Sequence, residues 1–169
     1  LPEHYEPMES PVKNIINSQN LNPTVKIIPF TKKEYGNREK YPYIATLYQI
    51  SEHWQAGGMT RNLPWLTELV PNMFCEISPE LAKKKGIMNG DRVRITSARG
   101  SIKSYALVTE RIQPFNINGE IQEMIGLIWH FGFSSDASGD IANILTPHIG
   151  DPNTMIPEFK AFLVDIKKV

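Results

Sequence analysis

The stretch from Thr46 to Arg61, which we call the lip, carries the residues best suited to binding chemistry. It begins with the alternation of a strand and ends with polar, aromatic and glycine residues: His53, Trp54, Gln55, Gly57, Gly58, Thr60 and Arg61. The glycines allow the backbone to approach a ligand, the hydroxyl and the guanidinium suit a phosphate, and the indole can cover a flat ring. The lip therefore predicts a site for a phosphorylated, ring-bearing molecule; the alternative is a polar loop that leaves a strand.

A second polar cluster follows the apolar run Met124–Trp129. It contains His130 at the end of that run, Asn143 in a loop that enters a short helix, and Lys160 before the last apolar segment. Free amides at a helix start can hold a phosphate, and an asparagine amide offers donors and acceptors to a nucleobase. Taken singly, Asn143 is better explained as a helix cap and Lys160 as a surface charge. Together with His130 and the lip, they favour one shared site.

Catalytic chemistry by this chain alone is not expected. The sequence has no nucleophile spaced next to a base, no glycine-rich phosphate loop of the nucleotide hydrolases and no paired carboxylates in a strand context. A single cysteine and four scattered histidines do not predict an all-protein metal site. Cys75 is predicted to be a core residue. Lys83–Lys85 are better explained as the basic last turn of a helix than as a phosphate site.

The composition predicts one domain with a buried core. The chain has 169 residues, 41% of them hydrophobic, and its 18 acidic and 18 basic residues balance to a net charge of zero. That balance does not suggest a nucleic-acid or membrane surface. No apolar run reaches the ~18 residues of a membrane span, so direct membrane insertion is not expected. The chain opens without a signal peptide or an initiator methionine, which suggests a piece of something longer.

Two parts of the chain differ in character. Residues 1–40 contain five prolines and few periodic apolar positions, which predicts an extended arm with one short strand at 25–28. Residues 41–169 carry the regular elements and are predicted to form the barrel domain. In this part, residues 41–51 are apolar on both faces, as in the wall of a closed barrel.

The elements that must position the two clusters are mainly short strands. Apolar alternation predicts strands at 41–51, 73–77, 92–97, 101–109, 124–129 and 161–167. Helical turns are predicted at 63–69, and a capped helix between Ser78 and Gly86. Residues 113–122 are predicted to be a polar loop with Asn118-Gly119 at its tip. Because strands and helices do not alternate regularly, this order indicates a small mixed barrel, mainly β with short helices, and not a doubly wound sheet.

Four groups of residues match sequence motifs of a known family and follow one another in the same order as in that family. They are LPEHYEPMESP at 1–11, EHWQAGGMTRNLPWL at 52–66, GIMNGDRV at 86–93 with SARG at 97–100, and ANILTP at 142–147 with GDPN at 150–153. With them the chain resembles the C-terminal molybdopterin-dinucleotide-binding domain of formate dehydrogenase catalytic subunits, within the molybdopterin oxidoreductases. The resemblance covers essentially the whole chain.

The resemblance implies a six-stranded double-psi β-barrel that closes over one half of a bis-molybdopterin guanine dinucleotide holding molybdenum or tungsten. Ten matching residues would line that site: Thr46, Tyr48, Gln49, His53, Thr60, Arg61, His130, Gly132, Asn143 and Lys160. The metal ligands and the iron–sulfur cysteines would belong to other domains. The implied activity is the oxidation of formate to carbon dioxide, with electron transfer to iron–sulfur clusters in anaerobic respiration.

The implied partners are the remaining domains of the catalytic subunit and an iron–sulfur electron-transfer subunit. The expected location is the periplasm, with the cytoplasm as the alternative. Two other functions stay open. The chain can belong to another molybdopterin oxidoreductase, acting on nitrate or a related oxyanion, because those enzymes share the barrel. It can also be a freestanding double-psi barrel that binds a ligand or partner without a redox role.

Overall fold

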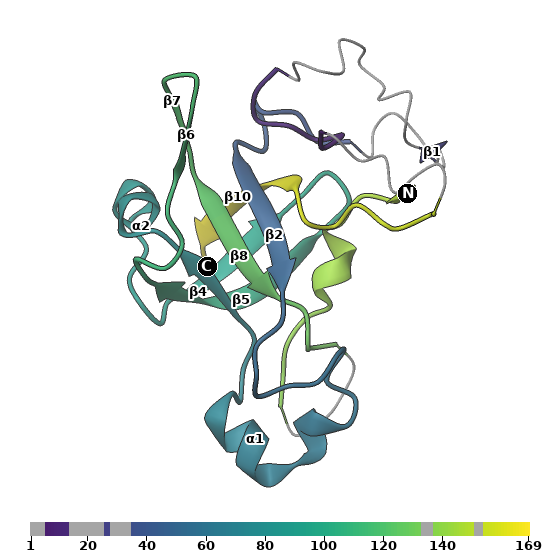
Figure 1. Ribbon diagram of the computed structural model, residues 1–169. Helices are drawn as coiled ribbons and strands as arrows, with labels where there is room; N and C mark the ends of the chain where they lie inside the picture. Colours follow the sequence, from purple (N-terminus) through teal and green to yellow (C-terminus); the bar gives the residue numbers. More distant parts are fainter. Residues whose placement is uncertain (1–5, 14–25, 28–34, 133–136, 151–153) are drawn as a thin grey trace.

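Six strands close into a barrel at the centre of the molecule (Figure 1). They are β2 (Tyr43–Tyr48), β3 (Phe74–Ile77), β4 (Arg92–Thr96), β5 (Ser101–Val108), β8 (Met124–Ile128) and β10 (Phe162–Lys168). The computed structural model describes residues 6–13, 26–27, 35–132, 137–150 and 154–169. The barrel confirms the predicted fold class, a mainly β chain with short helices and a six-stranded double-psi barrel.

The strand order around the barrel is β10, β2, β8, β3, β5, β4 and back to β10. Strands β2 and β8 are parallel, as are β3 and β5, and the four other neighbouring pairs are antiparallel. Tyr48 at the end of β2 lies opposite Ile128 at the end of β8. Because parallel strands end at the same edge, the chain leaves both strands at one end of the barrel.

Alternating side chains fill the barrel. Tyr43, Ala45 and Leu47 of β2 are buried, while the residues between them are partly exposed. On β5, Ile102 and Ala106 point inward in the same way. Because side chains alternate between the faces of a strand, this period of two places the apolar set in the core. Full burial of one such aliphatic side chain stabilises the fold by about 1.5–3 kcal/mol.

The predicted helices are confirmed. Helix α2 (Pro79–Lys85) begins where the Ser78 hydroxyl accepts a hydrogen bond from the Leu81 amide at 3.0 Å, and it ends at Gly86 with a φ of 64°. Helix α1 (Pro64–Leu69) follows a short 3-10 turn, η2 (Thr60–Asn62). The predicted short helix after Gly139 forms as the 3-10 turn η3 (Ala142–Ile144).

The prediction of a loop at 113–122 is wrong. This segment is a hairpin of β6 (Phe115–Ile117) and β7 (Glu120–Gln122), which projects from the barrel in Figure 1. Asn118 and Gly119 have φ values of 53° and 85°, the left-handed conformation that a two-residue hairpin turn requires. The Asn-Gly pair was therefore a hairpin signal, and the low hydrophobicity of the flanking residues hid it.

The arm is anchored on the barrel through Glu9. Its buried carboxylate accepts hydrogen bonds from the amides of Gly36 (2.6 Å) and Leu163 (2.7 Å) and pairs with Arg99. Further along the arm, β1 (Lys26–Ile27) pairs with β9 (Ile149–Gly150). The ends of the predicted strand at 25–28 lie outside the described residues, and the domain boundary at residue 40 stays a prediction. In the described part of the chain, no helix has the length and apolar character of a membrane span.

Candidate functional site

The lip continues past β2 into a lobe, residues 49–72, that extends from one end of the barrel (Figure 1). The lobe contains η2 and α1 and returns to the barrel at β3. Because β2 and β8 are parallel and end together, the residues that follow β8 emerge beside the lobe. The barrel topology thus brings the start of the second predicted cluster against the first.

His130 joins the two clusters. Its Nε2 atom accepts a hydrogen bond from the Ile50 amide at 2.8 Å, and its Nδ1 atom donates one to the Gln55 carbonyl at 2.5 Å. This pattern requires the neutral tautomer with the proton on Nδ1, since an amide can only donate and a carbonyl can only accept. The ring is fully buried, and burial lowers the pKa of His130, which favours the same neutral form. Both ring nitrogens are therefore used to hold the lip.

His53 has a similar internal role. Its Nε2 atom donates to the Val70 carbonyl at 3.1 Å, so its Nδ1 atom accepts from the Thr60 hydroxyl, also at 3.1 Å. The Thr60 oxygen accepts in turn from the Trp54 amide. The His53 and His130 ring centroids lie 6.0 Å apart. The chain Trp54, Thr60, His53, Val70 closes the lobe on itself.

Arg61 is buried in the same cluster, with 1% of its surface exposed. Its guanidinium carbon lies 5.9 Å from the centre of the Phe131 ring, and burial lowers the pKa of Arg61. Gly57 permits this packing. Its φ is +78°, and a Cβ atom there would lie 2.1 Å from the His130 carbonyl oxygen. Three buried residues of the predicted site, His53, Arg61 and His130, thus form one cluster with the partly exposed Thr60.

Tyr48 and Gln49 line a cavity of about 680 Å³ between the barrel and the lobe. The Tyr48 hydroxyl donates to the buried Glu76 carboxylate, which also receives an Nη2–H of Arg111 at 2.5 Å. Burial first, and then the Glu76 charge, raise the pKa of Tyr48 well above its usual value. The sequence reasoning missed Glu76 and Arg111. The available signal was an acidic residue inside the apolar strand β3.

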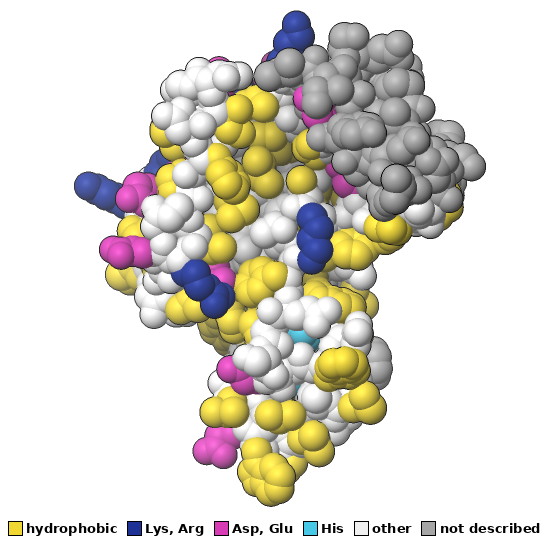
Figure 2. Space-filling view, viewed as in Figure 1, with side chains coloured by type: hydrophobic (Ala, Val, Ile, Leu, Met, Phe, Trp, Pro, Cys, Tyr) yellow, Lys and Arg dark blue, Asp and Glu magenta, His cyan; other side chains and the backbone are white. Residues whose placement is uncertain are grey.

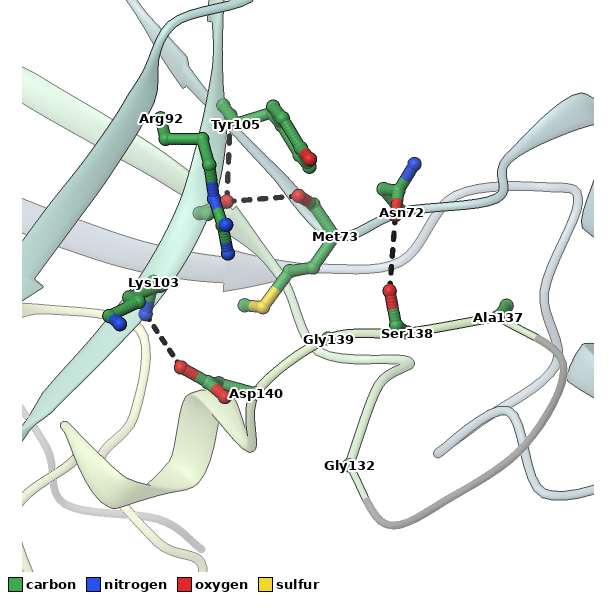
Figure 3. A pocket seen from close by; sticks show the side chains of 11 residues that line it. Asn72, Met73, Arg92, Lys103, Tyr105, Gly132, Ala137, Ser138, Gly139 and Asp140 are labelled. Carbon is green, nitrogen blue, oxygen red and sulfur yellow. Dashed lines mark hydrogen bonds between the residues drawn. The ribbon is translucent and has the colours of Figure 1, made fainter. Parts of the chain in front are cut away.

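Gly132 lines a different cavity, of about 460 Å³, shown in Figure 3. There the strand residues Arg92 and Tyr105 face the loop that carries Asp140. The Arg92 guanidinium carbon lies 5.7 Å from the Tyr105 ring centre, and the Lys103 amide donates to Asp140 at 2.6 Å. Gly132 and the pair Tyr48 and Gln49 therefore line separate cavities.

The three other predicted residues lie on the barrel surface. Lys160 is exposed, and its ammonium donates to the Leu47 carbonyl at 2.5 Å, which holds it beside β2 and near Thr46. Thr46 is partly exposed on the outer face of β2. Asn143 is exposed in η3, which packs near β5. The described residues do not join Asn143 to the lip by a contact.

Four exposed groups in these segments have chemistry that suits a dinucleotide. The exposed groups are the side-chain amides of Gln49 and Asn143, the ammonium of Lys160 and the ring of Trp54, which is 59% exposed. Amides match a nucleobase edge, an ammonium matches a pyrophosphate, and an indole covers flat rings. Gly57 and the hydrogen bonds of His53 and His130 hold the lip backbone in its observed shape.

Reactive groups are not assembled within the described residues. No group of three or more His, Cys, Asp and Glu side chains there is placed to hold a metal ion. Cys75 is buried as predicted, and burial raises the pKa of its thiol to about 12. A thiol with that pKa is protonated at neutral pH and is a poor nucleophile.

Comparison with known proteins places the chain in a family. Residues 43–163 match the family described as "Molydopterin dinucleotide binding domain". The chain is 49% identical to formate dehydrogenase subunit alpha of Megalodesulfovibrio gigas, over 99% of this chain and 17% of that protein. It is 43% identical to the major subunit of the nitrate-inducible formate dehydrogenase of Escherichia coli, and 42% identical to formate dehydrogenase 2 subunit alpha of Nitratidesulfovibrio vulgaris, with the same coverage.

These relatives are much longer than the chain, which spans 17% of their length. Among solved structures, acetylene hydratase from Pelobacter acetylenicus superimposes with a TM-score of 0.62 at 14% identity, over 78% of this chain and 19% of that one. At this identity the likeness shows the fold alone.

Proposed function

Because the chain belongs to the molybdopterin dinucleotide binding domain family, we propose that it closes over one half of a bis-molybdopterin guanine dinucleotide in a formate dehydrogenase catalytic subunit. The resemblance to these subunits is confirmed, and the chain corresponds to one domain of them. The structural observation that carries the proposal is the joining of the two polar clusters by His130. It supports a single site built from the lip and the segment after β8.

In this proposal the residues have two kinds of role. His53, Thr60 and His130 hold the lip in shape through hydrogen bonds within the protein, and the buried Arg61 packs against the Phe131 ring. Direct contacts fall to exposed groups: the amides of Gln49 and Asn143 and the ammonium of Lys160, with Trp54 over a flat ring. The cofactor, when bound, supplies the redox chemistry, while this chain binds it, orients it and excludes water.

The proposed reaction of the whole subunit is the oxidation of formate to carbon dioxide, which releases one proton and two electrons. In this proposal the metal is molybdenum or tungsten and is held by other domains. The electrons pass to an iron–sulfur partner subunit. Support for formate comes from the relatives' names and from the extent of the match. A periplasmic location stays a prediction.

Cofactor retention by the intact subunit tests the binding role. The measured quantity is the amount of guanine nucleotide and oxidised pterin that each purified subunit releases on denaturation. We expect Asn143→Ala and Lys160→Ala each to lower this amount by about tenfold when cofactor is limiting, because the loss of about 1.4 kcal/mol of binding free energy lowers affinity tenfold. The matched control is Lys167→Ala, which removes a lysine of β10 whose side chain is 77% exposed and should leave the content unchanged. Normal content in both test variants would remove these residues from the site.

Substrate identity needs a separate assay. The intact subunit, purified with its partner, should reduce a viologen dye when given formate, and metal analysis should find one molybdenum or tungsten per subunit. Reduction of nitrate, without dye reduction by formate, would instead assign the chain to an oxyanion reductase.

A further inference from the structure

A cavity of about 460 Å³ lies between β5 and the loop that follows β8 (Figure 3). Gly132 lines this cavity, but none of the nine other predicted site residues does. Its volume falls within the range of about 300–1,000 Å³ that small-molecule sites occupy. The cavity therefore has room for a ligand outside the contacts assigned to the lip.

Two basic side chains line this cavity. Arg92 at the start of β4 and Lys103 in β5 are both exposed, and neither side chain forms an ion pair with a described residue. The Arg92 guanidinium carbon lies 5.7 Å from the centre of the Tyr105 ring, which keeps the guanidinium beside the cavity. A guanidinium and an ammonium without carboxylate partners are suited to an oxyanion.

Further cations lie next to Lys103 on the outer face of the barrel. Strand pairing places Arg94 directly opposite Lys103, and Lys167 directly opposite Arg94. Like charges directly opposite one another destabilise a sheet. On the face of the molecule shown in Figure 2, by contrast, Lys and Arg side chains are scattered. The row of cations across three strands gives this side of the cavity a positive potential, which favours an anionic ligand.

Two carboxylates offset part of this charge. Asp165 lies 2.7 Å from Lys85 and 3.5 Å from Lys167. Asp140 lines the cavity itself, where its Oδ2 atom accepts a hydrogen bond from the Lys103 amide at 2.6 Å. Neither carboxylate pairs with the ammonium of Lys103 or with a guanidinium of β4, so these cations stay available to a ligand.

Neutral groups complete the cavity on its other side. Asn72 and Ser138 lie across from Arg92 and Lys103 in Figure 3. The Asn72 Oδ1 atom accepts a hydrogen bond from the Ser138 hydroxyl at 3.2 Å, which leaves the N–H groups of the amide as donors. The Tyr105 ring, which also lines the cavity, is 37% exposed. The lining thus combines cations, an aromatic ring and an amide, the groups that recognise a phosphate, a flat base and the edge of that base.

We propose that this cavity binds a nucleotide, with Arg92 and Lys103 on the phosphate oxygens. Tyr105 then packs against the base, and the Asn72 amide donates to its edge. Two molecules carry this chemistry: a free nucleotide, and the nucleotide end of the cofactor proposed above. Binding of the second rests on the proposed function, and the two arms of the experiment distinguish these sources.

The first arm is calorimetric titration of the full-length, cofactor-loaded subunit with GDP and with guanosine at low salt. GDP should bind at least about tenfold more tightly, because only GDP carries phosphates for the cations to bind. Arg92→Ala and Lys103→Ala should each weaken GDP binding by at least about tenfold, because each removes a charge-assisted hydrogen bond. The matched control is Lys83→Ala, which removes an exposed lysine from α2, outside the cavity lining, and should leave the affinity unchanged.

The second arm measures the guanine nucleotide that the same variants release on denaturation, after production with limiting cofactor. If the nucleotide end of the cofactor fills the cavity, Arg92→Ala and Lys103→Ala should lower this amount by about tenfold. GDP should then give no binding heat in the loaded subunit, since its site is occupied. Lys83→Ala should again match the unchanged protein.

Weaker GDP binding with normal nucleotide content assigns the cavity to a free nucleotide, and lower content without GDP binding assigns it to the cofactor. Three results would overturn the site: GDP binding that neither substitution weakens, equal affinity for GDP and guanosine, or normal content in variants of a subunit that does not bind GDP.

The proposed function is judged separately, by the cofactor content of Asn143→Ala and Lys160→Ala. If that content falls while Arg92→Ala and Lys103→Ala change neither measured quantity, the binding role of the lip stands and the nucleotide cavity is rejected. Weaker GDP binding in Arg92→Ala and Lys103→Ala, with normal content in the other two variants, would do the reverse.

Discussion

Replacement of Glu9 by alanine should release the N-terminal arm from the barrel. The Glu9 side chain is fully buried and pairs with Arg99, whose side chain is 11% exposed. Both guanidinium Nη atoms donate to the Glu9 carboxylate, and the Nε atom donates to the Leu145 carbonyl at 2.8 Å. The same carboxylate accepts the amides of Gly36 and Leu163. One side chain therefore joins the arm, the turn before β5 and the start of β10.

The expected cost is large because several buried groups lose their partner together. Removal of one member of a buried ion pair typically destabilises a protein by about 3–5 kcal/mol, and this range includes the buried amides left without an acceptor. For a chain of this size, each kcal/mol lowers the melting temperature by about 2–4 °C. Glu9→Ala should therefore lower it by roughly 6–20 °C. Glu9→Gln keeps an acceptor oxygen and should cost less.

Urea unfolding of the 169-residue chain, followed by circular dichroism, measures the change in free energy. The double variant Glu9→Ala with Arg99→Ala completes a thermodynamic cycle and should cost less than the sum of the single changes. The control is Arg38→Ala, which breaks the pair with Glu120 at the surface, where both side chains are about half exposed. That change should cost below about 1 kcal/mol. If Glu9→Ala costs no more than the control, the buried carboxylate does not anchor the arm.

Three further predictions concern the lip and α2. Gly57→Ala should destabilise the chain by more than about 2 kcal/mol, because Gly57 has a positive φ and the added Cβ atom would clash with the His130 carbonyl. Gly90→Ala is the control: Gly90 has a φ of +85° but no atom lies near its Cβ position, so the change should cost only about 1 kcal/mol. Equal losses of stability in urea unfolding would contradict the clash at Gly57. Since burial lowers the pKa of His130, the unfolded chain binds a proton that the folded chain does not, so the free energy of unfolding should fall as pH drops below about 6.5, by up to about 1.4 kcal/mol per pH unit. His130→Asn should flatten this dependence between pH 7.5 and 5.5, and equal slopes in the two proteins would reject the argument. Ser78→Ala should lower the free energy of unfolding by about 1–2 kcal/mol in the same assay, because it removes both the α2 cap and the hydrogen bond to Glu123. An unchanged free energy of unfolding would contradict the role of Ser78 as a cap.

The cluster around His53 and His130 gives both histidines of the predicted site hydrogen-bond partners within the protein. His53 and His130 were predicted as cofactor contacts from the resemblance, and the structure gives all four ring nitrogens partners within the protein. Their chemical identity still matters, because a neutral imidazole offers one donor and one acceptor in fixed directions. No hydrocarbon side chain can join an amide and a carbonyl in this way.

Some features of the molecule were determined locally by the sequence. Helix α2 follows from Ser78, Pro79 and Gly86, and the strands follow from apolar residues at every second position. These signals act between residues a few positions apart, so the chain carries them whatever the fold. The element order also indicated a small barrel, and the family resemblance added its six strands and the dinucleotide. The structure confirms the six-stranded barrel, and the family match supports the dinucleotide.

Other features exist only in the folded molecule. Arg99 meets Glu9 across 90 positions, and Tyr48 and Arg111 meet on Glu76, because the closed barrel brings distant segments together. Neither pairing has a local signal, since a carboxylate in an apolar strand does not reveal which cation faces it. The parallel register of β2 and β8 likewise decided that His130, the start of the second predicted cluster, would meet the lip at one end of the barrel. The sequence determined which groups were available, and strand pairing decided which were buried together and which stayed open to a ligand.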